Sequence, residues 1–417
     1  MSKHHSDIVI VGAGLAGAET AFALRESGDD RRIVVLGREP WMPYDRPPLS
    51  KAYLKGTSAR GQLWLRPEAS YAEGNIEMHL GVSAIAIDTS ERRVLLDGGK
   101  SLDYGQLILA MGGEARSLPI TGAGLDGVMA LKTLDDADRL ATRMAEQPVV
   151  VIIGAGYVGM EFAASARLAG CDVTLVEDKS RVLSRSISPV IAFHLQQEYE
   201  RLGVKIMTDA RVAQIEGGAH AERVVLADGR CLPADLVLVS VGNRASDALA
   251  RDAGILLAEG GGILVDQDGR TSDPNVFAAG DCAARQYEGL QDPQRLESVQ
   301  SAVAQARRVA AVITGQSSGR EETPWFWSDQ FDIKLQMAGL PLPGDTELVR
   351  GDPGSGRFSV IYQNEKALTA IQCVNSPGDF LAAKKMIAQR RCFAAEALCD
   401  QQIPMRDIAR GTQVVAP

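Results

Sequence analysis

The sequence has 417 residues, a length that predicts two or three domains. Its hydrophobic share of 45% and charged share of 23% are those of a soluble globular protein, and no apolar run approaches the ~18 residues of a membrane span. Lys and Arg number 44 against 53 Asp and Glu, so the net charge of −9 argues against a nucleic-acid-binding protein.

The first predicted unit begins with a short apolar strand that enters a glycine-rich turn. Residues 7–17 read DIVIVGAGLAG, residues 18–26 have a helical pattern, and residues 33–36 form a second apolar strand. A strand, a GxGxxG turn and a helix are the parts of a dinucleotide-binding βαβ unit.

The same pattern occurs a second time. Residues 149–159 read VVVIIGAGYVG, and a helical stretch at 160–169 and a strand at 172–176 follow. The similarity continues downstream, since residues 94–110 and 224–241 each contain a strand, a DG turn and another apolar run. One GxGxxG is a weak signal, whereas two copies with matching downstream halves predict two related nucleotide-binding domains.

The remaining residues predict a third, different domain. A strand is expected within 271–281 and a helix at 298–314. After residue 324 the sequence predicts strands at 334–338, 358–362 and 369–374, a Gly/Pro-rich mobile loop at 339–356 and a helix at 377–389. The predicted fold class is α/β, with two Rossmann-like domains and a C-terminal α+β domain. The predicted boundaries are 1–115 with 243–323 for the first nucleotide domain, 116–242 for the second, and 324–417 for the C-terminal domain.

The two glycine motifs are predicted to hold pyrophosphates at helix N-termini, where backbone amides point at the ligand. The glycines concerned are Gly12, Gly14 and Gly17 in the first copy and Gly154, Gly156 and Gly159 in the second. Glu177 ends the second strand of the second copy, where a carboxylate accepts the ribose hydroxyls of NADH and repels the 2′-phosphate of NADPH. In the first copy the ribose ligand is predicted to be Glu39, with Arg38 as the open alternative.

The first nucleotide is predicted to be FAD. Asp281 follows the strand within 271–281 and has a carboxylate that can accept ribityl hydroxyls. A helix that begins near Ser298, with Val299 in its first turn, would direct positive potential at a reduced flavin. The proline-stiffened segment from Arg46 to Lys51 adds two cations.

The cysteines and histidines point away from thiol and metal chemistry. The first of six cysteines is Cys171 and no CxxC pair occurs, so a disulfide relay behind the first glycine motif is not expected. The histidines, which include His4 and His5, have no metal-ligand spacing. The N-terminus shows no signal-peptide pattern, and a cytoplasmic location is expected.

The sequence resembles the FAD-dependent ferredoxin reductases of bacterial oxygenase systems, the family of putidaredoxin reductase and the biphenyl dioxygenase reductase component. The segments that carry the resemblance are GAGLAG at 12–17, PYDRPPLSKAYL at 43–54, LAMGGEARSLP at 109–119, GAGYVGMEFA at 154–163, AAGDCA at 278–283, LESVQSAVAQA at 296–306 and PWFWSDQFDIKLQMAGL at 324–340. The resemblance implies a glutathione-reductase-like fold, FAD, NADH and a [2Fe-2S] ferredoxin partner that feeds a dioxygenase or a cytochrome P450.

The resemblance also implies particular cofactor contacts. Those to FAD are implied for Ala16, Lys51, Ala84, Lys132, Asp281, Val299 and Trp327, and those to NAD for Val158, Glu161, Glu177, Arg185 and Gly242. The sequence departs from the family pattern at Met111, where a threonine is frequent, and at Arg38, where an acid is frequent.

Lys51 and Glu161 are the predicted catalytic residues. We expect an ion pair between them, which orders the site and supports the charge that develops on a reduced flavin. Trp327 stands in the aromatic run 325–327, which is more often core, and we expect it near the flavin and near the route by which electrons leave.

An acidic ferredoxin needs a local basic patch on a chain of net charge −9. The candidate cations are Arg66, Arg307, Arg308, Lys384, Lys385, Arg390 and Arg391. Two other functions stay open at this point: a reductase for another one-electron carrier such as rubredoxin, and a flavoprotein whose reduction state acts as a binding switch.

Overall fold

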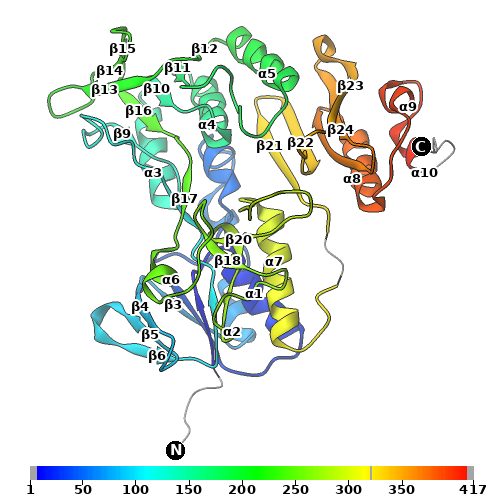
Figure 1. Ribbon diagram of the computed structural model, residues 1–417. Helices are drawn as coiled ribbons and strands as arrows, with labels where there is room; N and C mark the ends of the chain where they lie inside the picture. Colours follow the sequence, from blue (N-terminus) through cyan, green and yellow to red (C-terminus); the bar gives the residue numbers. More distant parts are fainter. Residues whose placement is uncertain (1–6, 320–321, 411–417) are drawn as a thin grey trace, which may run out of the picture. The chain divides into compact units, whose positions relative to one another are not determined.

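The computed structural model describes residues 7–319 and 322–410 (Figure 1). The described residues divide into two compact units, each assembled from several chain segments. Unit 1 draws on the segments Met1–Asp45, Arg60–Glu114 and Asn243–Glu322. Unit 2 draws on Arg46–Ala59, Ala115–Gly242 and Thr323–Pro417.

Unit 1 is built on a parallel five-stranded sheet in the order β19-β7-β1-β2-β3. Its strands are β1 (Ile8–Val11), β2 (Ile33–Gly37), β3 (Ile76–Leu80), β7 (Gln106–Leu109) and β19 (Val276–Ala278). The long helices are α1 (Leu15–Glu26) and α7 (Val299–Ile313), and α2 (Glu68–Glu73) is short.

Both faces of this sheet are buried, which explains why β1 is uniformly apolar. Successive side chains of a strand alternate between the faces. Ile8 and Ile10 therefore pack with α1 and α7, whereas Val9 and Val11 pack into a second core on the other face. That second core includes residues of a three-stranded antiparallel sheet within residues 84–103 and of a short helix at 248–252.

The smaller elements of unit 1 complete the second core. They are β4 (Ala84–Asp88), β5 (Arg93–Leu96), β6 (Ser101–Asp103), β18 (Ile263–Val265), β20 (Ala283–Arg285) and α6 (Ala248–Asp252). Two further short strands pair with one another, β8 (Gly113–Ala115) and β17 (Asn243–Ala245).

Unit 2 contains a second parallel sheet, in the order β12-β11-β10-β16-β9. Its strands are β9 (Val128–Met129), β10 (Val149–Ile153), β11 (Asp172–Val176), β12 (Val204–Met207) and β16 (Leu236–Val239). The helices are α3 (Leu134–Met144), α4 (Tyr157–Leu168) and α5 (Pro189–Arg201), and the antiparallel strands β13 (Val212–Glu216), β14 (Arg223–Leu226) and β15 (Cys231–Pro233) form a small third sheet.

The strand orders confirm that the chain contains two related α/β folds. The series β3-β2-β1-β7 in unit 1 has the same order and parallel direction as β12-β11-β10-β16 in unit 2. In each copy the strand that precedes the glycine motif lies at the centre of the sheet, where parallel-sheet enzymes bind nucleotides at the strand ends.

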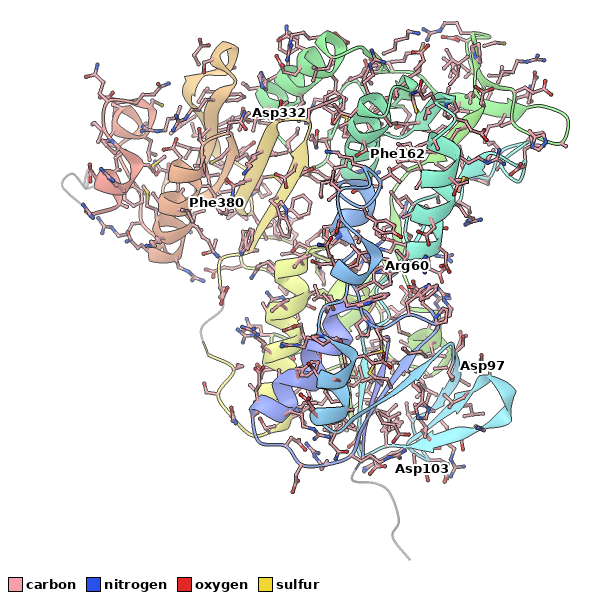
Figure 2. All side chains as sticks on the ribbon, turned by 180° about the vertical axis from the view of Figure 1, so that it is seen from behind. Arg60, Asp97, Asp103, Phe162, Asp332 and Phe380 are labelled. Carbon is pink, nitrogen blue, oxygen red and sulfur yellow. The ribbon has the colours of Figure 1, made fainter. Side chains whose placement is uncertain are left out.

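The rest of unit 2 is an antiparallel sheet in the order β21-β22-β25-β24-β23. Its elements are β21 (Trp325–Gln330), β22 (Ile333–Gly339), β23 (Thr346–Asp352), β24 (Arg357–Gln363), β25 (Leu368–Val374), α8 (Pro377–Gln389), α9 (Ala395–Cys399) and α10 (Met405–Arg410). Helix α8, which carries Phe380 (Figure 2), packs against β25 and β22 around an apolar core.

The structure corrects the expectation for this region in two places. The stretch 339–356, predicted to be a loop, contains the strand β23 from Thr346 to Asp352. The aromatic run at 325–327 is part of the strand β21, which the sequence analysis did not predict. The helix predicted at 377–389 is present with those bounds.

The chain divides into two units and not three, because unit 2 holds the segments 116–242 and 324–417 together with residues 46–59. The boundary between the second and third predicted domains therefore stays a prediction. Within the described residues, no helix is both long and apolar enough to cross a bilayer. The residues 7–319 and 322–410 also contain no group of three or more metal-ligating side chains, and His4 and His5 lie outside them.

Candidate active site

The first glycine motif joins β1 to α1 in unit 1. Gly12 has a φ of 117°, and a Cβ placed there would lie 2.1 Å from the carbonyl oxygen of Ala110. A Cβ at Gly17 would lie 1.9 Å from the carbonyl oxygen of Gly12. Only glycine fits these two positions, whereas a Cβ at Gly14 would meet no heavy atom within 4 Å. The turn is therefore tight on its protein side, with Gly14 as the N-cap of α1.

The second motif in unit 2 repeats these contacts. Gly154 has a φ of 103°, and its Cβ would lie 2.3 Å from the carbonyl oxygen of Ser240. A Cβ at Gly159 would lie 2.2 Å from the carbonyl oxygen of Gly154. Helix α4 begins after Gly156 with no side-chain cap and no acidic residue in its first turn. An uncapped helix N-terminus without a competing carboxylate suits a pyrophosphate.

Glu177 stands directly after β11 and contacts this second turn. Its Oε2 accepts a hydrogen bond from the amide of Ala155 (2.7 Å), and its Oε1 accepts one from the amide of Lys179 (3.0 Å). Burial raises the pKa of Glu177, and a hydrogen bond from Glu177 lowers the pKa of its neighbour Asp178. The carboxylate is thus oriented by two backbone amides at the carboxyl end of the strand, where an adenosine ribose binds in dinucleotide folds.

The corresponding position in unit 1 is less clear-cut. Glu39 follows β2 by two residues, and its Oε2 accepts a hydrogen bond from the hydroxyl of Tyr44 (2.5 Å). Arg38 has a side chain that is 70% exposed and forms an ion pair with Glu114 at 3.1 Å. The choice between the two as ribose ligand stays a prediction.

The other residues expected to contact FAD in unit 1 lie on several elements. Gly280 has a φ of 78°, and a Cβ there would lie 2.9 Å from the Cβ of Ala16, so the segment that holds Asp281 packs against the start of α1. Helix α7 begins at Val299, and the hydroxyl of its N-cap Ser298 accepts from the amide of Ser301. Ala84 begins β4 in the antiparallel sheet.

Lys51 and Glu161 form an ion pair within unit 2, with 2.9 Å between Nζ and Oε1. Their side chains are 15% and 7% exposed. Lys51 follows the short 3-10 helix Pro47–Ser50, and Glu161 lies in the second turn of α4, just beyond the glycine motif. A buried pair at the start of the nucleotide-binding helix is where a charge could act on a bound cofactor, and this role stays a prediction.

Two serines complete the hydrogen bonds of Glu161, and the sequence analysis missed both. The Ser50 hydroxyl donates to Oε2 (2.5 Å), and the Ser328 hydroxyl donates to Oε1 (2.6 Å). Ser328 also accepts from Gln330 Nε2 (3.1 Å), and Gln330 Oε1 lies 2.9 Å from the hydroxyl of Tyr199. The signal was the alternation of polar residues along β21, which becomes legible once residues 325–330 are read as a strand.

The remaining predicted contacts in unit 2 have these positions. The guanidinium of Arg46 donates to the carbonyl oxygen of Lys132 (2.5 Å). Val158, in the first turn of α4, is 40% exposed, and Arg185 is exposed. Trp327 is half-buried on β21, with its ring 5.4 Å from that of Trp325. Gly242 has a φ of 109°, which suits only glycine.

The candidate docking cations fall in both units and differ in their surroundings. In unit 1, Arg66 and Arg307 both pair with Glu19, at 3.5 and 3.9 Å. Arg308 is 16% exposed and pairs with Asp268. In unit 2, α8 carries Lys384 and Lys385, and Arg390 and Arg391 follow directly after it. The ammonium of Lys384 lies over the ring of Trp325, 5.1 Å from its centre.

The thiols of the chain all lie within the described residues. All six cysteines are free, and Cys171, Cys282 and Cys373 are buried. Burial raises the pKa of the Cys282 thiol to about 11 and that of Cys373 to about 12, so both stay protonated at neutral pH.

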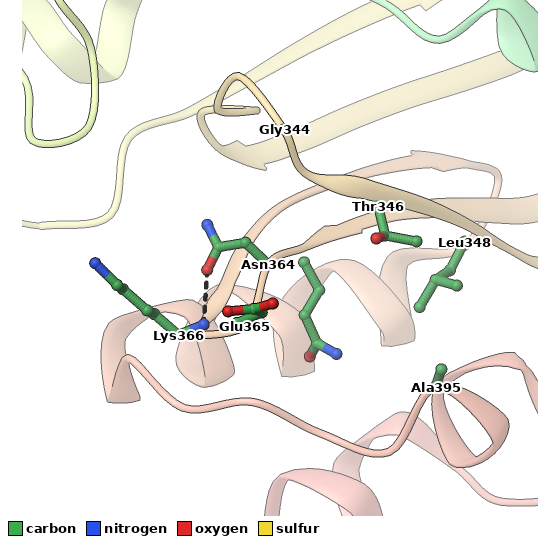
Figure 3. A pocket seen from close by; sticks show the side chains of 8 residues that line it. Gly344, Thr346, Leu348, Asn364, Glu365, Lys366 and Ala395 are labelled. Carbon is green, nitrogen blue, oxygen red and sulfur yellow. Dashed lines mark hydrogen bonds between the residues drawn. The ribbon is translucent and has the colours of Figure 1, made fainter. Parts of the chain in front are cut away.

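A surface pocket of about 590 Å³ lies in the C-terminal part of unit 2 (Figure 3). Its lining includes Gly344, Thr346, Asn364 and Lys366, and none of the residues that line it is among the predicted site residues. It therefore plays no part in the chemistry considered below.

Comparison with known proteins gives the class. The model of the pyridine nucleotide-disulphide oxidoreductase family matches residues 6–306, and that of the reductase C-terminal domain matches residues 325–409. The chain belongs to the pyridine nucleotide-disulphide oxidoreductase family, and its fold is glutathione-reductase-like.

Individual relatives narrow this class. A ferredoxin–NAD(P)+ reductase of Sphingomonas sp. is 39% identical, with 98% of both chains covered. The ferredoxin–NAD+ reductase component of the biphenyl dioxygenase system of Paraburkholderia xenovorans is 36% identical over 97% of this chain and 98% of its own. The covalent putidaredoxin reductase–putidaredoxin complex has a reductase-like chain with a TM-score of 0.94 and 36% identity, covering 98% of this chain and 99% of that one.

Within its family, the chain is therefore a flavoprotein oxidoreductase of the group of ferredoxin reductases that serve oxygenase systems. The family implies FAD and NAD(P)H as its cofactors. The two uncapped glycine turns, each closed to any side chain at its first and third glycine, fit two dinucleotides.

Proposed function

We propose that the chain takes a hydride from NADH onto FAD and passes single electrons to a [2Fe-2S] ferredoxin that feeds a dioxygenase or a cytochrome P450. The observation that carries this proposal is the buried ion pair of Lys51 and Glu161. Glu161 belongs to α4, the helix that starts at the second nucleotide turn, so the pair brings a positive charge to the nucleotide site. FAD supplies the chemistry when bound, since a flavin accepts two electrons together and releases them one at a time.

The chain's own contribution is charge and orientation. Lys51 carries a positive charge that can support negative charge on a reduced cofactor, and Glu161 holds that ammonium in one position. Glu161 is in turn held by two hydroxyl donors, so the pair cannot swing into other rotamers without breaking buried hydrogen bonds. Preorganised charges of this kind need no rearrangement during the reaction.

The preference for NADH over NADPH is proposed to rest on Glu177. Its two oxygens are already aligned by the amides of Ala155 and Lys179, and each oxygen retains a lone pair for a ribose hydroxyl. A 2′-phosphate at the same place would meet this carboxylate and be repelled.

The electrons are proposed to leave by direct contact with an external acceptor, because the sequence has no cysteine before Cys171 and therefore none just behind the first glycine motif. The aromatic pair Trp325 and Trp327 lies on β21, and Lys384 lies over Trp325. Lys384 thus places a positive charge beside Trp325, the neighbour of the predicted exit residue Trp327. A positive charge at this place suits the docking of an acidic ferredoxin. Lys384 and Lys385 on α8 are therefore the docking residues we favour, with Arg390 and Arg391 beside them.

Charge reversal tests this docking surface. The variant Lys384→Glu with Lys385→Glu should slow ferredoxin reduction and weaken its dependence on salt, while NADH-to-ferricyanide activity stays unchanged. Lys205→Glu, which changes an exposed lysine of the same unit, is the control and should leave both activities unchanged. A parallel fall of both activities in the double variant would show that the lysines serve the fold or the flavin.

The function itself is tested by anaerobic titration of the purified flavoprotein. Stoichiometric NADH should bleach the flavin absorbance faster than NADPH does, and added [2Fe-2S] ferredoxin should then take up the electrons. Transfer to rubredoxin and not to any ferredoxin would replace the proposed acceptor. Reduction by NADH without transfer to either carrier would favour a redox-controlled binding switch.

A further inference from the structure

Strand β21 presents its two faces to different surroundings within unit 2. Phe326, Ser328 and Gln330 are every second residue of the strand and therefore lie on the same face. Phe326 contacts the ring of Tyr157 at 4.6 Å, and Ser328 contacts Glu161 at 2.6 Å. Tyr157 and Glu161 are four residues apart on α4, so one face of the strand matches one face of the helix.

The polar residues on this face are buried to a degree that demands partners. Ser328 is 0% exposed, Gln330 is 1% exposed and Tyr199 is 0% exposed. Burying polar groups in this way costs free energy unless every one is hydrogen-bonded. An apolar residue at position 328 would avoid that cost, so the serine calls for an explanation other than packing.

The hydrogen bonds of these residues run in one direction. Gln330 Nε2 donates to Ser328 Oγ at 3.1 Å, and Ser328 donates to Glu161 Oε1 at 2.6 Å. The hydroxyl of Tyr199 lies 2.9 Å from Gln330 Oε1 and 2.8 Å from the carbonyl oxygen of Met160. Gln330 occupies one lone pair of the Ser328 oxygen and leaves its hydrogen for the carboxylate. The chain therefore ends on the oxygen of Glu161 that also accepts from Lys51.

We infer that Ser328 is a positioning residue for the Lys51–Glu161 pair, held in its donor orientation by Gln330. This inference rests on the proposed function, since it assigns Ser328 a part in hydride transfer from NADH. Ser50 fixes the other carboxylate oxygen, so Glu161 is held at both oxygens and has one orientation toward Lys51. Ser328 acts through Glu161 and need not touch any cofactor.

The test is a double-mutant cycle in the flavin-loaded protein. Ser328→Ala should lower the limiting rate of flavin reduction by NADH about tenfold, as expected for loss of a hydrogen bond to a charged group, while half-saturation stays within about twofold. In a Glu161→Ala background the same change should have almost no further effect, because the group it acts on is gone. A serine with only a packing role would slow both backgrounds equally, and that result would overturn the inference.

Ser359→Ala is the matched control. Ser359 is also 0% exposed, lies in the same sheet and donates to a carboxylate, that of Asp379 at 3.1 Å. Its loss should leave flavin reduction within about twofold, although it too removes a hydrogen bond from a buried serine to a carboxylate. Equal slowing by both serine variants would also refute the inference.

Thermal unfolding of the flavin-loaded variants, followed by the release of flavin fluorescence, gives a readout independent of turnover. The fall in Tm caused by Ser328→Ala should be largely lost in the Glu161→Ala background, and full additivity would count against the hydrogen-bond chain. If Ser328→Ala fails to fold, Gln330→Met replaces it in the same cycle and should show the same coupling at smaller amplitude. Failure of NADH to reduce the wild-type flavin would overturn the proposed function instead, and the unfolding cycle would still decide whether the network exists.

Discussion

Replacing Glu177 by alanine is predicted to abolish the proposed preference for NAD+ over NADP+. The carboxylate is the group at the end of β11 that can accept both ribose hydroxyls, and its two oxygens are aligned by the amides of Ala155 and Lys179. NAD+ and NADP+ are the right probes, because they bind without reducing the flavin and so report affinity alone.

The magnitude follows from the bonds that would be lost. A hydrogen bond to a charged group contributes about 1.5–3 kcal/mol, so loss of ribose contacts should weaken NAD+ binding by roughly 2–3 kcal/mol, or about 30- to 150-fold. For NADP+ this loss is offset, because two unit charges 4 Å apart at an effective dielectric constant near 20 repel by about 4 kcal/mol, and half-burial reduces that figure. The affinity ratio should therefore approach one.

The same variant should also be slightly less stable. The amide of Ala155, a residue that is 1% exposed, loses its carboxylate acceptor, which costs about 1–2 kcal/mol. The amide of Lys179 is exposed, so water replaces the lost bond there. Thermal unfolding separates this effect from the change in nucleotide affinity.

Isothermal titration calorimetry with each nucleotide measures the predicted shift. The control is Asp172→Ala, which removes an exposed carboxylate from the opposite end of the same strand and should leave both affinities within about twofold. If Glu177→Ala keeps the wild-type ratio of Kd values, the ribose is recognised elsewhere and the reasoning is wrong.

The pH dependence provides a second check on Glu177. Burial raises its pKa, so NAD+ affinity should begin to fall on acidification above the pH expected for an ordinary glutamate, about 4.3. The effect on stability has the opposite sign: because the pKa of Glu177 is raised in the folded state, the folded protein binds the proton more tightly than the unfolded chain does. The free protein should therefore gain stability from this group as the pH falls through the raised pKa toward the ordinary one. In Glu177→Ala both pH effects should disappear, and their persistence would assign them to other groups.

Three further predictions concern the flavin, the ion pair and the C-terminal sheet. Gly12→Ala should yield protein that binds little FAD, read from the visible absorbance, since its Cβ would lie 2.1 Å from a backbone oxygen at a φ of 117°. Glu161→Ala and Lys51→Ala should each slow flavin reduction, measured by stopped flow, at least about tenfold. Each should also cost about 3 kcal/mol of stability, because the buried charge of its partner is left unpaired. Unchanged rates in both variants would remove the pair from the mechanism. Arg350→Met should lower the free energy of unfolding by about 3–5 kcal/mol, because the guanidinium of this 4% exposed residue pairs with Asp379 and donates to three backbone carbonyls. A Tm within about 1 °C of wild type in thermal unfolding would contradict this prediction.

The parts of the fold that the sequence predicted are those specified by local pattern. The glycine turns demand glycine for steric reasons within a few residues, and central parallel strands such as β1 and β10 are apolar throughout because both faces are buried. Within the C-terminal sheet, the two strands that were not predicted, β21 and β23, are both edges. Edge strands carry polar and charged residues, which blurs their pattern.

The difference between local and long-range signals also explains why Lys51 and Glu161 were predicted as a pair while Ser328 was missed. Glu161 is conspicuous in sequence because it follows the second glycine motif by two residues, and Lys51 because it ends a proline-stiffened basic segment. A serine between a tryptophan and an aspartate is not conspicuous. Its role depends on a helix that lies 167 positions away in the chain and reaches it only in the folded unit. A hydrogen bond between such distant residues leaves no periodic trace in a single sequence.

The register of β21 separates two tasks that a single strand must serve. Trp325 and Trp327 lie on the face opposite Ser328 and Gln330, and Trp325 is covered by Phe380 and Lys384 of α8. Pairing with β22, in which Trp327 opposes Gln336, keeps these faces apart. A slip of one residue would bring a tryptophan to Glu161 and expose the serine on the α8 side, so the two-residue period of the strand is what places the hydrogen-bond donor and the aromatic pair on their separate sides.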